Sequence, residues 1–182
     1  EPEEGNILID GIDIAQIDPA DLRKGISYVP QDIHLFGGTI KQNILGIHKF
    51  IDDEWMLECS KISGTDEFVR MHPAGYDMPL GERGAGLSGG QRQSVGIARA
   101  LINNSDIWMF DEPTNAMDQT SESIVLNNLM SKIEGKTLLL VTQKMSMVDL
   151  VDRIIVMNFG TKVLDGPKDE IINKLGNSGE KQ

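Results

Sequence analysis

Two short groups of residues in the middle of the chain could carry out phosphate chemistry. The first is the run Ser88-Gly89-Gly90-Gln91. Ser88 and Gln91 have the spacing of a capping box, and the two glycines leave the first N–H groups of the helix without side chains around them. Accessible amides at a helix N-terminus bind anions. The run is therefore a candidate site for the terminal phosphate of a nucleotide, although an ordinary capped helix explains this run equally well when it is taken alone.

The second group is the carboxylate pair Asp111 and Glu112, which follows the apolar run 107–110. Open α/β sheets bind ligands at the carboxyl ends of their strands. Two adjacent carboxylates there can divide the work: Asp111 would hold magnesium through water, and Glu112 would accept a proton from the water that attacks the phosphate. The alternative is a pair of acidic residues that only begins a loop. It is disfavoured because Pro113-Thr114 and then Asp118 follow.

The elements that must position these groups alternate between strand and helix. Apolar patterns predict strands over residues 6–10, 26–29, 107–110 and 137–141, the last suited to a buried parallel strand. Helices are predicted over residues 20–24, 122–133 and 168–175, and a hairpin over 154–157 and 162–164. This order indicates an α/β fold.

A helical segment interrupts that alternation. Thr39 and Gln42 form a second capping-box pattern, an acidic start at residues 52–54 suits another helix, and residues 65–71 suit a third. We therefore expect one domain, in which residues 1–38 and 102–182 form an α/β core and residues 39–101 form a helical subdomain.

Composition excludes other classes of protein. The net charge is −11 and the 17 basic residues are scattered, which argues against a nucleic-acid groove. No apolar stretch approaches the roughly 20 residues that cross a bilayer, so we expect any membrane link to come from elsewhere. Cys59 is the only cysteine, so an internal disulfide is impossible and a reducing, cytosolic setting is favoured.

Together these motifs resemble those of the ATP-binding domains of ABC transporters. Residues 29–32 are similar to the Q-loop of that family, 87–91 to its signature loop, 111–112 to the end of Walker B, and 115–118 to its D-loop. Residues 35–40 and 81–84 are closer to exporters than to importers. Residues 72–77, 151–153 and 165–168 are similar to the ATPase half of type I secretion exporters. The resemblance covers nearly the whole chain and implies a P-loop NTPase-like core.

The resemblance also implies cofactors and residue roles. ATP and Mg²⁺ are the expected cofactors. Gln31 would contact the magnesium and the attacking water, and Glu82 would face the coupling helices of the exporter. Residues 88–91 would bind the nucleotide of a second subunit, so that two copies close head to tail around two ATP molecules. Asp118 would lie at their junction.

Two departures from the family pattern bear on activity. Where the family has a catalytic histidine that contacts the terminal phosphate, this chain has Gln143. A glutamine amide donates a hydrogen bond but carries no charge, so we expect binding to be retained and hydrolysis to be slowed. In addition, no G-x-x-x-x-G-K-[ST] phosphate loop occurs in the 182 residues. The resemblance places that loop and an inner strand just before Glu1, so we expect this chain alone to lack the N-terminal part of the core, to bind ATP poorly and to be marginally stable.

The function implied by the resemblance is an ATP-hydrolysing domain that powers the export of a protein or peptide, at the cytoplasmic face of the inner membrane. Its expected partners are a second copy, the transmembrane domain and, in type I secretion, a periplasmic adaptor and an outer-membrane channel; no nucleic acid is expected. Two alternatives stay open. One is an ATP-responsive dimerisation module without turnover, favoured by Gln143 and by the missing phosphate loop. The other is a soluble ABC ATPase, disfavoured by the acidic charge and by residues 81–84.

Overall fold

The computed structural model describes residues 2–48 and 50–179, and the chain divides into two compact units, Glu1–Val141 and Thr142–Gln182. Each unit is described by itself. The division into an α/β core and a helical subdomain at residues 39–101 stays a prediction.

The first unit opens with a small hairpin and a short helix. Strands β1 (Leu8–Ile9) and β2 (Ile12–Asp13) pair antiparallel. After a 3₁₀ helix at Ile14–Gln16, the backbone N–H of Ala20 donates to the side chain of Asp18 at 2.7 Å, which caps helix α1 (Pro19–Lys24). Proline at the first helical position fits because that N–H would have no partner within the helix.

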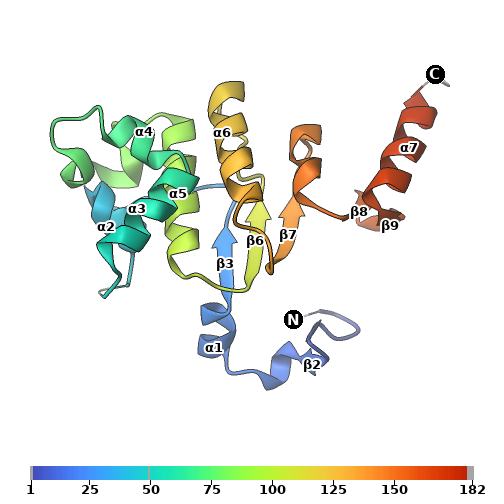
Figure 1. Ribbon diagram of the computed structural model, residues 1–182. Helices are drawn as coiled ribbons and strands as arrows, with labels where there is room; N and C mark the ends of the chain where they lie inside the picture. Colours follow the sequence, from blue (N-terminus) through green and yellow to red (C-terminus); the bar gives the residue numbers. More distant parts are fainter. Residues whose placement is uncertain (1, 49, 180–182) are drawn as a thin grey trace. The chain divides into compact units, whose positions relative to one another are not determined.

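A three-stranded parallel sheet forms the centre of this unit (Figure 1). Strand β6 (Ile107–Asp111) lies between β3 (Ile26–Val29) and β7 (Thr137–Val141). Trp108 and Phe110 of β6 are buried and stacked, with 5.6 Å between ring centroids. Parallel strands joined through helices confirm the α/β prediction. They also place Asp111 at the carboxyl end of the middle strand, in register with Val141.

Strand β7 is parallel as predicted, but the prediction that it is buried was wrong. Leu139 and Val141 are 52% and 55% exposed. Within the described residues β7 pairs with β6 alone, so its second edge has no neighbouring strand there. Apolar side chains on a parallel strand are normally covered on both faces. Leu139 and Val141 are therefore more exposed than apolar side chains on a parallel strand usually are.

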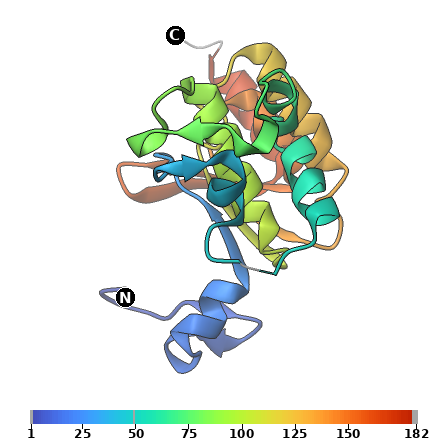
Figure 2. The same ribbon diagram turned by 90° about the vertical axis from the view of Figure 1, so that its left-hand side faces the viewer.

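The segment between β3 and β6 is mainly helical (Figure 2, cyan to green). Its elements are β4 (Gly38–Thr39), α2 (Ile40–Leu45), α3 (Asp53–Ile62), α4 (Thr65–Val69), a 3₁₀ helix at Gly75–Asp77, β5 (Pro79–Leu80), a 3₁₀ helix at Glu82–Gly84 and α5 (Gly89–Ile102). Helix α5 contacts α2, α3, α4 and β3. The capping box of Thr39 and Gln42 is present at the start of α2, as predicted.

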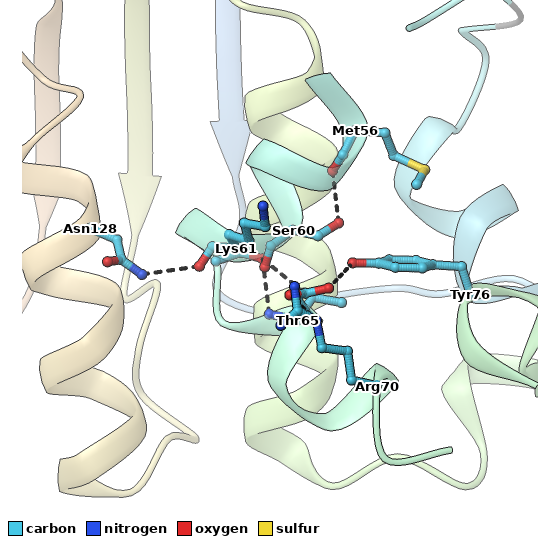
Figure 3. A network of polar contacts seen from close by, with 9 residues as sticks. Met56, Ser60, Lys61, Thr65, Arg70, Tyr76 and Asn128 are labelled. Carbon is cyan, nitrogen blue, oxygen red and sulfur yellow. Dashed lines mark hydrogen bonds and ion pairs between the residues drawn. The ribbon is translucent and has the colours of Figure 1, made fainter. Parts of the chain in front are cut away.

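A polar network ties these helices together (Figure 3). The hydroxyl of Tyr76 donates to Asp66 at 2.8 Å, and Arg70 forms an ion pair with the other oxygen of Asp66 at 2.7 Å. From α6, the side-chain amide of Asn128 donates to the carbonyl of Lys61 at 3.0 Å, near the end of α3. Tyr76 thus fastens the segment after α4 to that helix, and Asn128 fastens α3 to α6.

Helix α6 (Gln119–Met130) begins three residues before the predicted start at residue 122. The cause is Asp118, whose side chain accepts hydrogen bonds from the backbone N–H groups of Thr120 and Ser121, both at 3.0 Å. An aspartate in this position satisfies the first amides of a helix and so fixes its start.

The second unit contains a 3₁₀ helix at Met145–Leu150, the antiparallel strands β8 (Arg153–Asn158) and β9 (Thr161–Pro167), and helix α7 (Lys168–Gly179). The predicted hairpin around Phe159-Gly160 is confirmed. Hydrogen bonds from Arg153 and Lys162 lower the pKa of Asp165 to about 2. Among the residues described in either unit, none of the helices is long and apolar enough to span a membrane.

Candidate nucleotide site

The N-terminus of α5 has the capping box that the sequence predicted. Ser88 Oγ accepts from the N–H of Gln91 at 3.1 Å, and Gln91 Oε1 accepts from the N–H of Ser88 at 2.9 Å. The N–H groups of Gly89 and Gly90 are the first of the helix and have no partner within it. The dipole of this 14-residue helix favours negative charge at the same end. This arrangement suits a phosphate oxygen.

The two glycines are also required by packing, which the sequence interpretation missed. A Cβ atom on Gly89 would lie 3.0 Å from Cβ of Ala116, and one on Gly90 would lie 3.1 Å from the carbonyl oxygen of Ala116. The latter neighbour is backbone, which yields less easily than a flexible side chain. Glycine therefore lets the segment around Ala116 lie directly against the start of α5.

The backbone at Glu112 is held in an uncommon conformation directly after β6. Its φ of 44° lies in the left-handed region, which residues other than glycine rarely adopt. The N–H of Glu112 donates to the carbonyl of Val141 at 2.9 Å, and its carbonyl accepts from the N–H of Asn115 at 3.2 Å. The hydrogen bonds at its N–H and at its carbonyl hold the backbone of Glu112, and so the position of its Cβ atom, at the carboxyl edge of the sheet.

Gln93 connects these two parts of the site. Its Nε2 donates to the carbonyl of Glu112 at 3.3 Å, and its Oε1 accepts from the N–H of Ala116 at 2.7 Å. The side chain is buried, with 5% exposure. Sequence reasoning did not select Gln93; the signal available was a polar residue four positions before the apolar Ile97, on the same face of the helix.

Asp118 lies beside the α5 terminus. Hydrogen bonds from the backbone N–H and the hydroxyl of Ser121, and from the N–H of Thr120, lower the pKa of Asp118. With Ser88, Gly90 and Gln91 it lines a cavity of about 280 Å³ whose other walls come from α4 and α6. The structure thus brings together four of the residues predicted to bind nucleotide.

A second cavity, of about 320 Å³, contains Gln31 after β3 and lies on another side of α5. Gly89, Gln93 and Ala116 also line it, so Gln31 lies close to the same helix terminus. Glu82 is exposed in the short helix that precedes Ser88. Gln143 is exposed in the second unit.

The donor set fits a nucleotide and, in part, magnesium. The α5 amides and the Ser88 hydroxyl suit phosphate oxygens, and Asp111 and Gln31 offer the oxygen ligands that Mg²⁺ prefers. Among residues 2–48 and 50–179 there is no group of three or more His, Cys, Asp and Glu side chains placed to hold a metal. A magnesium ion here would therefore depend on phosphate oxygens and water for its remaining ligands, as this ion commonly does.

Comparisons with known proteins point to one family. The sequence profile of the ABC transporter family matches residues 1–115. The leukotoxin translocation ATP-binding protein LktB of a Pasteurella haemolytica-like species (strain 5943B) is 42% identical over 171 residues, which are 94% of this chain and 24% of that protein. The leukotoxin export ATP-binding protein LtxB of Aggregatibacter actinomycetemcomitans is 40% identical, with the same coverage.

A solved structure supports the fold assignment. The structure of a bacterial Atm1-family ABC exporter with ATP bound superimposes with a TM-score of 0.91 at 34% identity, covering 96% of this chain and 31% of the exporter chain. The fold is therefore the P-loop NTPase-like fold of ABC exporters, as the sequence predicted. The chain spans about a quarter of the length of the curated relatives that it matches.

Proposed function

The chain belongs to the ABC transporter family, and we propose that it is the ATP-binding and ATP-hydrolysing domain that powers the export of a protein or peptide. The observation that carries this proposal is the convergence of Ser88, Gly90, Gln91 and Asp118 on one cavity at the α5 terminus. Two relatives whose names specify leukotoxin translocation or export support the transport role and the class of substrate.

In this proposal residues 88–91 act on the nucleotide of a second copy. The α5 amides and the Ser88 hydroxyl donate to its terminal phosphate, so two chains meet head to tail around two ATP molecules. Asp118, which carries a negative charge at neutral pH, lies at their junction. Because each site uses both chains, hydrolysis requires dimerisation.

Asp111 and Glu112 serve the nucleotide bound by their own chain. Asp111 and Gln31 would hold the magnesium ion, which would supply positive charge to offset that of the phosphates. Glu112 accepts the proton of the attacking water as a general base. The contacts at its N–H and carbonyl support this role, because a base must be placed within hydrogen-bonding distance of the water.

Glu82 connects the domain to the membrane part of the exporter. It is exposed, and the short helix that contains it runs directly into the segment leading to Ser88. A transmembrane domain that docks there would sense the state of the signature loop. In a type I secretion system the assembly would also include a periplasmic adaptor and an outer-membrane channel, with this domain at the cytoplasmic face of the inner membrane.

Gln143 favours slow turnover, and it is the observation behind a second candidate function. If the amide at this position supports no hydrolysis, the domain would act as an ATP-responsive dimerisation module. The names of the relatives count against a third possibility, a soluble ABC ATPase unconnected with transport.

ATP turnover by the complete protein in lipid nanodiscs tests the proposal. We expect magnesium-dependent hydrolysis that Glu112→Gln abolishes, together with ATP binding that Glu112→Gln leaves intact. Binding without turnover in the unsubstituted protein would favour the dimerisation module. Neither binding nor turnover would overturn both functions.

A further inference from the structure

Gln93 makes a buried bridge between helix α5 and the turn that follows β6. One end of its amide donates to the carbonyl of Glu112, and the other accepts from the N–H of Ala116. The same side chain lines the cavity that contains Gln31. Gln93 thus contacts the backbone of Glu112 and the backbone of Ala116 in the D-loop segment, and it also lines the cavity that contains Gln31.

The two ends of this bridge serve different ATP molecules under the proposed function. Glu112 acts on the nucleotide of its own chain, whereas the α5 terminus, five residues before Gln93 at Ser88, acts on the nucleotide of the partner. The bridge is therefore placed so that a movement of the α5 terminus at one ATP site changes the position of Glu112 at the other. The close packing of Ala116 on Gly89 and Gly90 adds a second contact between the same two segments.

The conformation of Glu112 gives the bridge a mechanical role. A φ of 44° persists at a non-glycine residue only when its surroundings hold it there. The Glu112 carbonyl accepts from the N–H of Asn115 and from Nε2 of Gln93, and Gln93 belongs to α5. A shift of α5 on binding the partner's nucleotide would be passed to Glu112 through this hydrogen bond.

We propose that Gln93 is a positioning residue that couples the Ser88–Gln91 loop to Glu112 and so links the two ATP sites of the dimer. This inference rests on the proposed function. It assigns no chemical step to Gln93. Its amide must be able to donate at one end and accept at the other, which an apolar residue of similar volume cannot do.

The experiment compares the complete protein in nanodiscs with Gln93→Met, which keeps the volume and removes both hydrogen bonds. We expect kcat for ATP to fall at least about tenfold, with KM within about twofold, because misplacing a catalytic group slows chemistry without weakening binding. Loss of two buried hydrogen bonds also lowers the melting temperature, so both rates are measured at a temperature at which both proteins are fully folded. Asn127→Leu, an exposed amide on α6, is the matched control and should behave like the unsubstituted protein.

A tandem-linked dimer with Gln93→Met in one half gives the sharper result. Each ATP site combines Glu112 of one half with the Ser88–Gln91 loop of the other half, so each site depends on both Gln93 bridges. Removing one bridge should therefore impair both sites and lower turnover well below half that of the unsubstituted linked dimer. Retention of half or more, or a loss that only follows the folded fraction, would overturn the inference. Where Gln93→Met gives no folded protein, Gln93→Glu, which keeps the acceptor toward Ala116, is judged by the same criteria.

Absence of turnover in the unsubstituted protein would instead count against the proposed function. In that case, a Gln93→Met variant that forms the ATP-bound dimer normally would overturn the coupling.

Discussion

The carbonyl oxygen of Ala116 lies 3.1 Å from the position that a Cβ atom on Gly90 would occupy. This contact joins the D-loop segment to the helix terminus that we assign to the partner's nucleotide. It explains why a residue with no side chain stands at the second position of α5, where helix propensity alone favours alanine.

Gly90→Ala should lower ATP turnover of the complete protein at least about tenfold, because the D-loop backbone must move to admit the methyl group. The melting temperature should change little, since alanine improves helix propensity by about 1 kcal/mol. Gly176→Ala in α7, where a Cβ meets open space, is the control and should keep full turnover. Normal turnover in Gly90→Ala would show that this close contact is dispensable.

Thr114→Val should destabilise the fold. The Thr114 hydroxyl donates to Glu122 Oε2 at 2.9 Å, and both residues are buried. Loss of a buried hydrogen bond to a carboxylate lowers the free energy of unfolding by about 1–3 kcal/mol, which urea denaturation measures. Thr120→Val, an exposed threonine on α6, should change it by less than about 0.5 kcal/mol. Equal stability of the two variants would mean that the bond contributes nothing.

Stability should fall at alkaline pH through Tyr76. Burial, and then the hydrogen bond to Asp66, raise the pKa of Tyr76 from 10.0 to about 12, partly offset by Ser60. The folded state therefore holds this proton more tightly than the unfolded state, so its contribution is complete below pH 10 and is lost as pH rises through about 12. Tyr76→Phe should show a shallower loss of stability between these values in urea denaturation. An identical slope would contradict the assignment.

Residues 1–182 alone should bind ATP poorly and unfold at a low temperature. Leu139 and Val141 on β7 are each about half exposed. Covering such surface contributes about 25 cal/mol per Å², so an added strand should stabilise the fold. Adding a phosphate loop and a strand beside β7 should raise the melting temperature and allow ATP binding. Micromolar ATP affinity of the 182 residues in calorimetry would refute this prediction.

Gln143→His should accelerate hydrolysis in the complete protein. A protonated imidazole adds a charge-assisted contact to the phosphate, and such transition-state contacts contribute roughly 10²-fold in rate. Initial rates at saturating ATP and magnesium measure the gain, with Gln119→His as a control for histidine placed elsewhere on the surface. Unchanged rates would show that Gln143 does not limit turnover.

The local elements were predictable because their signals are contained in short stretches of sequence. The capping boxes of Thr39 and Ser88 each join residues three positions apart, and the hairpin turn at Phe159-Gly160 is equally local. Helix α6 starts three residues before the predicted residue 122, because the cap at Asp118 and not the apolar pattern fixes its start. The exposure of β7 was missed because burial depends on neighbouring strands and not on the strand itself.

The site was predictable only where a motif lies along the chain. Ser88, Gly89, Gly90 and Gln91 are consecutive, and the structure places three of them with Asp118 around one cavity. The bridge from Gln93 to Ala116 joins residues 23 positions apart, so the sequence shows neither the contact nor its direction. How Gln143 approaches the nucleotide depends in the same way on contacts between distant parts of the protein.

The most direct test of the central claim mixes two inactive variants of the complete protein, Ser88→Arg and Glu112→Gln, and measures ATP turnover. If residues 88–91 act on the partner's nucleotide, the mixed dimer contains one site with an intact loop from one chain and an intact Glu112 from the other. Turnover should then rise above that of either variant alone, whereas the double variant mixed with unsubstituted protein should form mixed dimers without a complete site. The account would be contradicted if the two single variants failed to complement each other while mixed dimers of the double variant and the unsubstituted protein were active. That result would place residues 88–91 and Glu112 of one chain at the same ATP site.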